Sequence, residues 1–237
     1  MSRLHRKDYK RDELVSTLET LTLSAERHAR SLIIAAGAVV VLIAAVAGGI
    51  WYSRSRAADA AAGLAAVHKA VEAPVIAQGA PAGMLTFASP SARAQEVLTR
   101  AEALLTEHPS SRQAHWAAYW KGVAQKDLGR FDEALATLDP LATLGDEPFL
   151  SALARMQRAQ VSEVKGDLAA AAESYASLAA SAPARFPVEI ALMNQARLLE
   201  AQGKPDEAKA IYRRVTQEYP ESPYASDAAR RSAPTAG

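Results

Sequence analysis

The chain of 237 residues lacks cysteine entirely. This absence excludes disulfide bridges, zinc sites built on thiolates and a cysteine nucleophile, and it leaves the redox compartment open. Aromatic residues are also scarce, at 6%, so the hydrophobic share of 49% consists mostly of small side chains. Small apolar side chains favour close helix packing over a β-sandwich. The composition therefore predicts an all-α fold.

An excess of charge of one sign is missing as well. The 27 Lys and Arg residues balance 26 Asp and Glu residues, which leaves a formal net charge of +1. A protein that tracks a phosphate backbone needs a basic field that this balance does not supply. We therefore expect no nucleic-acid partner.

One uncharged apolar run stands out, the 21 residues from Leu32 to Tyr52. At about 1.5 Å per residue, a helix of this length spans the roughly 30 Å hydrocarbon core of a bilayer. Trp51 and Tyr52 close the run as interfacial anchors, and arginines flank it at positions 27, 30, 54 and 56. The run predicts a transmembrane helix over 32–52. The alternative is a signal peptide cleaved after Ala47, against which the mixed-charge leader and the continuing apolar run both argue.

The segment before this run, residues 1–31, carries seven Lys and Arg residues. The positive-inside rule therefore predicts a cytoplasmic tail, with the bulk of the chain on the far side of the membrane. Within the tail, Leu14, Leu18, Leu21 and Ala25 share one helical face, which indicates a short amphipathic helix.

The rest of the chain divides by composition into four segments. Residues 53–73 read as an Ala-rich helix that Pro74 ends, and residues 74–89 form a Pro/Gly linker. Alternating helices and short turns follow over 90–229, and 230–237 is expected to be a disordered tail.

Residues 90–229 contain an internal repeat with a period of 37 residues. Four kinds of marker recur at this step: a glycine, an alanine five residues later, a bulky residue four further on, and a closing position that is usually proline. They are Gly129, Gly166 and Gly203; Ala134, Ala171 and Ala208; Leu138, Tyr175 and Tyr212; and Asp146, Pro183 and Pro220. Glycine permits the left-handed turn between two antiparallel helices, and alanine permits their close approach. The bulky residue fills the gap to the next hairpin, and proline ends the second helix.

This pattern resembles the tetratricopeptide repeat, whose usual period is 34 residues. The resemblance covers residues 91–220, although the tryptophan position of the first helix holds Ala118, Arg155 and Leu192. The expected fold is all-α, with one transmembrane helix followed by a tetratricopeptide-like solenoid of helical hairpins.

The whole layout resembles the bacterial family of single-span tetratricopeptide proteins that includes the ancillary Sec translocon subunit. The resemblance rests on the tail RKDYKRDELV, one span, an Ala-rich helix, a linker and degenerate repeats that begin near His115 and Trp116. It implies an inner-membrane protein with a cytoplasmic N-terminus and a periplasmic domain. The implied function is that of a non-enzymatic adapter or chaperone-like protein, which binds partner proteins or apolar client segments near the translocon. An envelope scaffold for cell-wall or division machinery is the alternative, because repeats specify a binding geometry and not a partner.

No constellation of residues predicts catalysis. The five histidines contain no His-x3-His pair for a metal, and each turn glycine is isolated, unlike the clustered glycines of a phosphate-binding loop. A hydrolase would need a clustered acid, base or metal that is not found. We therefore expect no enzyme activity, no cofactor, no metal and no small-molecule substrate.

What remains is a binding surface, since stacked helical repeats line a groove with their first helices. Counting back from the turn glycines places twelve residues there: Trp116, Tyr119, Val123 and Lys126; Leu153, Met156, Gln160 and Glu163; Ile190, Met193, Arg197 and Glu200. Aromatic and Met side chains suit loose capture of apolar peptides. The alternative is that Trp116, Trp120, Leu153 and Ile190 form the core between repeats.

Overall fold

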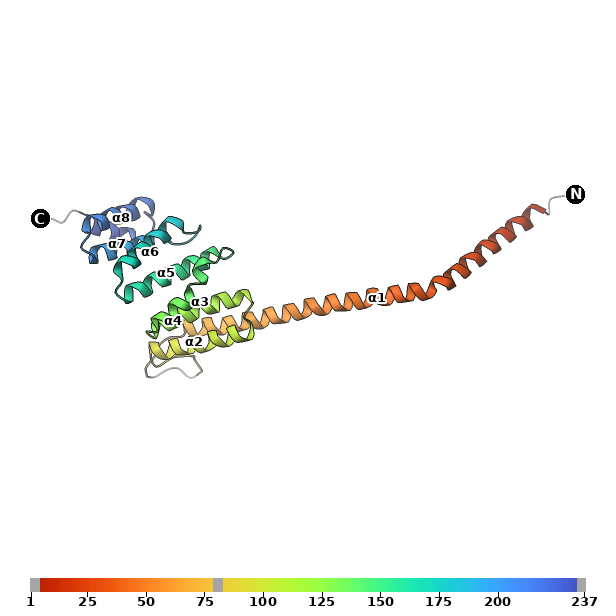
Figure 1. Cartoon of the computed structure of the whole chain (residues 1–237), viewed down its shortest axis with the longest axis horizontal. Coiled ribbons are helices and arrows are strands. Elements are labelled where there is room, and N and C mark those ends of the chain that lie inside the picture. Colours follow the sequence, from red (N-terminus) through yellow and green to blue (C-terminus); the bar gives the residue numbers. More distant parts are fainter. Residues whose placement is uncertain (1–4, 79–82, 234–237) are drawn as a thin grey trace. The chain divides into compact units, whose positions relative to one another are not determined.

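The chain is all-α, and the computed structural model describes residues 5–78 and 83–233, with the backbone alone for 5–30 and 32. In these residues nine α-helices and one 3-10 helix follow one another, and the only β-type pairing is a single isolated bridge (Figure 1). The helices are α1 His5–Glu72, α2 Pro90–Glu107, α3 Arg112–Asp127, α4 Phe131–Leu138, η1 Leu141–Thr143, α5 Pro148–Val164, α6 Leu168–Ser181, α7 Val188–Ala201, α8 Pro205–Glu218 and α9 Ala225–Ser232.

Two compact units divide the chain, residues 1–56 and residues 57–237. Helix α1 begins in the first unit and ends in the second. Helix α1 runs without a break through the tail segment, the apolar run and the Ala-rich segment. The apolar face predicted for the tail helix lies outside the side chains that the structure describes.

Among the described residues, the apolar part of α1 is exposed and packs against no other helix of the first unit. Every side chain described from Ile33 to Arg54 is exposed, and the segment is long and apolar enough to cross a membrane. At its C-terminal end the Arg56 guanidinium lies 5.7 Å from the centre of the Tyr52 ring, a pairing suited to the headgroup layer. This helix fits a single-pass membrane anchor.

In the second unit, the end of α1 packs on α2. Ala60, Val67 and Ala70 are buried against Leu98 and Leu104, in a cluster that also contains residues of α3. Arg100 Nη1 donates a hydrogen bond across this contact to the Ala66 carbonyl oxygen at 2.9 Å. The Ala-rich segment therefore belongs to the same compact unit as the helices that follow, and its small side chains allow α1 to pack against α2.

The ends of the segment predicted as a linker are held together. The Phe87 N–H donates to the Pro74 carbonyl at 3.1 Å, and the Ile76 N–H donates to the Phe87 carbonyl at 2.8 Å. Phe87 also packs on the cluster between α1 and α2. The connection between these two helices is therefore anchored at both of its ends.

The three turn glycines adopt the left-handed conformation that the sequence predicts, with φ of 76° at Gly129, 87° at Gly166 and 74° at Gly203. Each turn is closed by the same backbone bonds. In the first, the Gly129 N–H donates to the Lys126 carbonyl at 2.9 Å and the Arg130 N–H donates to the Gln125 carbonyl at 2.8 Å. These bonds satisfy carbonyl groups at the helix end that would otherwise lack a partner.

The alanine and bulky markers are buried where the repeat register requires. Ala134, Ala171 and Ala208 are fully buried, as are Leu138, Tyr175 and Tyr212. A small residue on the first helix of each hairpin packs near the bulky residue of the second helix. The small residues are Gly122 for Leu138, Ala159 for Tyr175 and Ala196 for Tyr212. The 37-residue register is therefore the packing register of the hairpins.

Helix α9 corrects the predicted C-terminal tail. Residues 225–232 are helical, so Arg230, Arg231 and Ser232 belong to an ordered element and only 234–237 lie outside the described residues. Ala228 is fully buried in the cluster of α7 and α8. The helix therefore covers the last hairpin.

Candidate functional site

The apolar members of the predicted groove lie in the cores between successive hairpins. Tyr119 and Met156 are buried, with 6% and 7% of their surface exposed. Partly buried residues pack around them or in the neighbouring clusters: Trp116, Val123, Leu153, Ile190 and Met193. This placement follows because each first helix must cover the apolar side of its neighbour.

Polar members of the predicted set come together instead. Lys126, Gln160, Glu163 and Arg197, which lie toward the C-terminal ends of α3, α5 and α7, line a cavity of about 500 Å³. The remaining lining residues are Asp127, Gly129, Phe131, Val164, Tyr175 and Asn194. We call this space the Tyr175 cavity. Glu200, nearer the C-terminal end of α7 than Arg197, does not line it.

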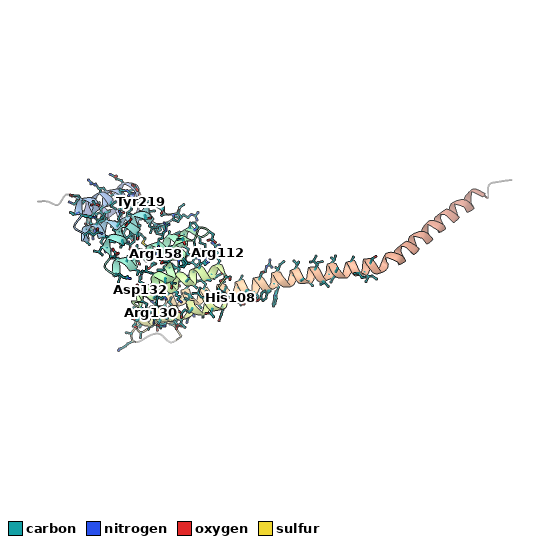
Figure 2. The ribbon with its side chains drawn as sticks, in the orientation of Figure 1. His108, Arg112, Arg130, Asp132, Arg158 and Tyr219 are labelled. Carbon is teal, nitrogen blue, oxygen red and sulfur yellow. The ribbon has the colours of Figure 1, made fainter. Side chains whose placement is uncertain are left out.

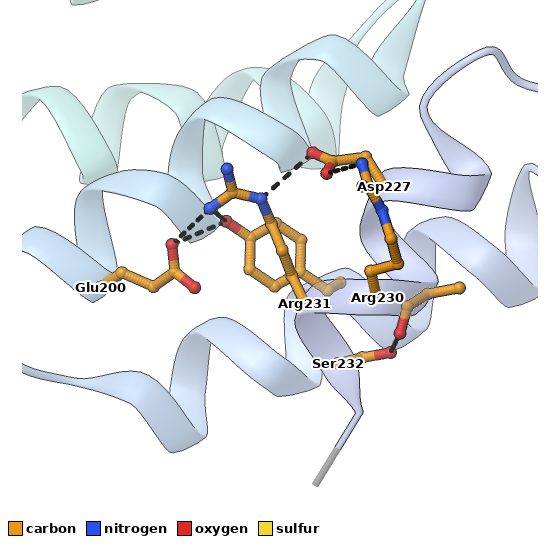
Figure 3. Close-up of polar contacts among 7 residues, drawn as sticks. Glu200, Asp227, Arg230, Arg231 and Ser232 are labelled. Carbon is orange, nitrogen blue, oxygen red and sulfur yellow. Dashed lines mark hydrogen bonds and ion pairs between the residues drawn. The ribbon is translucent and has the colours of Figure 1, made fainter. Parts of the chain in front are cut away.

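Polar pairs join α3 to α5, α5 to α7 and α7 to α9. Lys126 Nζ donates to Gln160 Oε1 at 2.9 Å, and Arg197 Nη2 donates to Glu163 Oε2 at 2.7 Å. The third pair joins Glu200 to Arg231 of α9 at 3.0 Å (Figure 3). We call these three contacts the inter-repeat pairs. They place alternating cationic and anionic groups along the same side of the array.

The hydroxyl of Tyr175 is buried in the wall of the cavity and has no hydrogen-bond partner among the described residues. Burial raises the pKa of this hydroxyl above its ordinary value of 10.0; the nearby Glu163 carboxylate acts in the same direction, and Arg197 opposes it. Tyr212 holds the equivalent position in the next repeat, and its Oη donates to Glu200 Oε2 at 3.0 Å. The two tyrosines thus differ in whether the protein itself satisfies the hydroxyl.

Lys126 is the second unusual group in the cavity. Its ammonium donates to two neutral amide oxygens, Gln157 Oε1 at 2.8 Å and Gln160 Oε1 at 2.9 Å. The nearest carboxylate oxygen, on Asp127, is 3.9 Å away, beyond hydrogen-bond distance. Burial lowers the pKa of Lys126 below its ordinary value, and the charge of Asp127 offsets part of this. The cavity therefore holds a desolvated cation without a directly bonded counter-ion.

Sequence reasoning did not place Tyr175 and Asn194 in this site, nor Gln157 beside Lys126. The sequence does carry a signal for the contacts between first helices, because Lys126 and Gln160 are 34 residues apart, as are Glu163 and Arg197. Complementary side chains at a spacing one turn shorter than the 37-residue period indicate contact between the end of one first helix and the middle of the next.

A second polar cluster lies between α3 and the start of α5. The Glu147 carboxylate is buried, and its oxygens lie 2.8 Å from His115 Nδ1 and 3.7 Å from Arg112 Nε. Arg112 begins α3, and His108 stands at the end of α2 (Figure 2). This cluster ties the turn before α3 to the start of α5. In the part of the chain that the structure describes, no three His, Cys, Asp or Glu side chains group as a metal site would require.

These hairpins define a helical-repeat protein of the kind that presents a surface to other proteins. A family comparison makes the assignment specific: the tetratricopeptide repeat-like domain matches residues 26–229, and the chain belongs to this family. The match starts ahead of the apolar span and ends within α9. Searches against curated proteins and against solved structures find no match.

Proposed function

We propose that this protein is a non-enzymatic, membrane-anchored adapter that binds partner proteins through the first-helix side of its repeats. The observation that carries the proposal is the Tyr175 cavity, an open polar site formed by three successive first helices of a tetratricopeptide repeat-like domain. Helical arrays of this kind generally bind polypeptides and leave catalysis to other folds. Membership of the tetratricopeptide repeat-like family also supports a role in binding partner proteins.

The membrane side of the proposal rests on α1. Its exposed apolar stretch from Ile33 supports a single-pass anchor, and the seven basic residues of the tail favour a cytoplasmic N-terminus. If the anchor crosses a bacterial inner membrane in this orientation, residues 57–237 lie on the periplasmic side. The resemblance to the ancillary Sec translocon subunit makes the translocon the partner that we propose first.

Partner proteins fit the observed surface better than apolar client segments do. Of the apolar side chains predicted to line the groove, Tyr119 and Met156 are buried and the others are partly buried, whereas the open site is lined mainly by amides and charged groups. A site of this composition recognises polar features of a folded or extended partner by hydrogen bonds.

A photo-crosslinking experiment in intact membranes tests the adapter function. Val164 lines the Tyr175 cavity and is 60% exposed, so benzoylphenylalanine at this position reaches whatever occupies the site. Ala169, exposed at the start of α6 and absent from the cavity lining, is the control position. We expect the Val164 probe to crosslink translocon subunits, detected with antibodies, and the Ala169 probe to do so much less. Crosslinks to cell-wall or division proteins would favour the scaffold alternative, and equal background at both positions would contradict the adapter function.

Protease treatment of spheroplasts tests the orientation. External protease is expected to degrade residues 57–237 and to spare the N-terminal tail. A protected C-terminal domain together with a cleaved tail would reverse the orientation, whereas a mature N-terminus near Gly48 would reveal a cleaved signal peptide.

A further inference from the structure

Four connections lead into α3, α5, α7 and α9, and they gather at one end of the second unit. Contacts join each of them to the next: His115 with Glu147, Phe149 with Phe186, and Glu189 with Ser222. We call this end, residues 108–111, 144–147, 182–187 and 219–224, the entry edge. The turn glycines and the Tyr175 cavity lie toward the other end of the same helices. The entry edge is therefore a separate surface from that cavity.

The first connection of the entry edge lies close to the point where α1 enters the second unit. Helix α2 runs back along α1, with Leu104 against Gly63, so its end at Glu107 comes level with Ala60. Arg56 follows the apolar stretch, and the chain from Arg56 to Ala60 reaches over about 14 Å at most. With α1 as the anchor, chain length alone keeps this connection near the headgroup layer.

The exposed aromatic side chains of the second unit also lie on the entry edge. Among the residues described from 57 onward, Phe149 and Tyr224 are the exposed aromatics, with 41% and 38% of their surface accessible, and every other Trp, Tyr and Phe is buried or half-buried. Phe149 follows the connection into α5, and Tyr224 ends the connection into α9. Membrane proteins place aromatic side chains of this kind at the level of the headgroups. Both exposed aromatics thus suit a contact with the membrane surface.

Arg185, in the connection into α7, adopts a backbone conformation that is costly for arginine. Its φ is 71°, and it is the one non-glycine residue with a positive φ in the described part of the chain. Glycine would turn the chain equally well and still let Phe186 enter the core. The Arg185 side chain is exposed and forms no hydrogen bond or ion pair with a described residue. Strain of this kind concentrates at functional positions, and this guanidinium is available to an external phosphate.

The exposed charges of the entry edge are balanced. In the connections and the first residue of each helix that follows, they are Arg112 and Arg185 against Asp146 and Glu221. A surface that binds anionic lipids by charge alone needs a cluster of Lys and Arg residues. A zwitterionic headgroup carries both signs, with a phosphate for the arginines and an ammonium for the carboxylates. The charge pattern therefore matches a zwitterionic phospholipid.

We propose that the entry edge rests on the phospholipid headgroup layer of the membrane that holds α1. Phe149 and Tyr224 insert among the headgroups, and Arg185 binds a lipid phosphate. The inference rests on the membrane anchor of the proposed function and adds a second membrane contact, made by the repeats themselves. The Tyr175 cavity, toward the other end of the helices, then stays open to partner proteins.

The lack of native cysteine allows one labelled position at a time in the full chain. Ala184→Cys, on the entry edge, and Lys204→Cys, at the other end of α7, are both exposed and carry nitrobenzoxadiazole. The chain is reconstituted in phosphatidylcholine vesicles that contain phosphatidylcholine with a nitroxide quencher on its headgroup. We expect the label at 184 to lose most of its fluorescence and the label at 204 to lose little. Equal loss at both positions, or no loss at 184, would overturn the proposal.

Arg185→Gly, made in the chain labelled at 184, tests the strained residue. Glycine accepts the positive φ, so the urea midpoint should rise, while quenching of the label should fall because the phosphate contact is lost. Arg213→Ala removes an exposed arginine of α8 outside the entry edge and should leave the quenching unchanged. Unchanged quenching in Arg185→Gly, or a lowered midpoint, would refute the role given to this residue.

A third label separates this inference from the anchor on which it rests. Leu42→Cys lies in the middle of the apolar run and is 64% exposed, so in the anchored protein its label is surrounded by lipid and shielded from iodide in the water. If the label at 42 is shielded and the label at 184 is not quenched, the anchor stands and the entry-edge contact fails. If iodide quenches the label at 42, the anchor itself is contradicted.

Discussion

The contact between Gly122 and Leu138 permits a sharp test of the hairpin packing. A Cβ atom added at Gly122 would lie 2.6 Å from Leu138 Cγ and 2.7 Å from its Cδ2, and Leu138 is fully buried. Overpacking of this kind costs about 1–3 kcal/mol. Because Gly122 lies inside α3, alanine also gains about 0.8–1.0 kcal/mol of helix propensity. We therefore expect Gly122→Ala to lower the free energy of unfolding by up to about 2 kcal/mol.

A second background reverses the sign of this effect. Leu138→Ala alone should cost about 2–5 kcal/mol because it leaves a cavity. Once the Leu138 side chain is gone, the added methyl group meets no clash, and Gly122→Ala should stabilise the protein by about 1 kcal/mol through helix propensity alone. The same substitution is thus destabilising in one background and stabilising in the other.

Urea unfolding of the full chain in micelles measures this cycle. Trp116 and Trp120 lie in α3 beside the substituted site, so their fluorescence reports on the hairpin that changes. If Gly122→Ala raises the midpoint with Leu138 present, or if the two substitutions add without coupling, the close approach of α3 and α4 at this point is refuted.

Three further predictions concern single residues of the repeats. Ala171→Leu should lower the free energy of unfolding by about 1–3 kcal/mol because Ala171 is fully buried, whereas Ala169→Leu on the exposed side of the same helix should change it by less than about 0.5 kcal/mol in urea titrations. Gly166→Ala, at φ of 87°, should cost about 1–2 kcal/mol in the same assay, while Gly145→Ala, with open space around its Cβ and no positive φ, should cost much less. The raised pKa of Tyr175 means that the unfolded chain ionises this hydroxyl first, so its stabilising contribution is complete below pH 10.0 and is lost as the pH rises above that value; thermal melts should show a smaller alkaline loss in Tyr175→Phe.

Local rules account for what the sequence predicts well. The positive φ at Gly166 and the burial of Ala171 follow from a marker pattern that repeats three times, because a turn and a close helix contact each depend on residues near in sequence. The apolar run from Leu32 is equally local, since its length and composition alone indicate a span. These features locate the hairpins and the anchor.

Contacts between hairpins account for what the sequence does not predict. The spacing from the turn places Tyr119 on a first helix, yet its burial depends on the residues of α5 that cover it. The position of Tyr175 in the cavity wall was hidden for a related reason, because residues from α3 to α7 line that cavity together. The packing of the Ala-rich segment on α2 is likewise a contact between segments separated by the Pro/Gly stretch, so the composition of the segment alone does not indicate it.

Helix α9 occupies the position that the first helix of a further repeat would take. Arg231 bonds to Glu200 as Arg197 bonds to Glu163, each Arg lying one element beyond its Glu. The eight residues of α9 thus make for the last hairpin a contact that the next hairpin makes elsewhere in the array. With α9 in this position the chain itself covers the apolar face of α7 and α8 around Ala228. A hairpin of a second molecule could stack on that face only after α9 had been displaced.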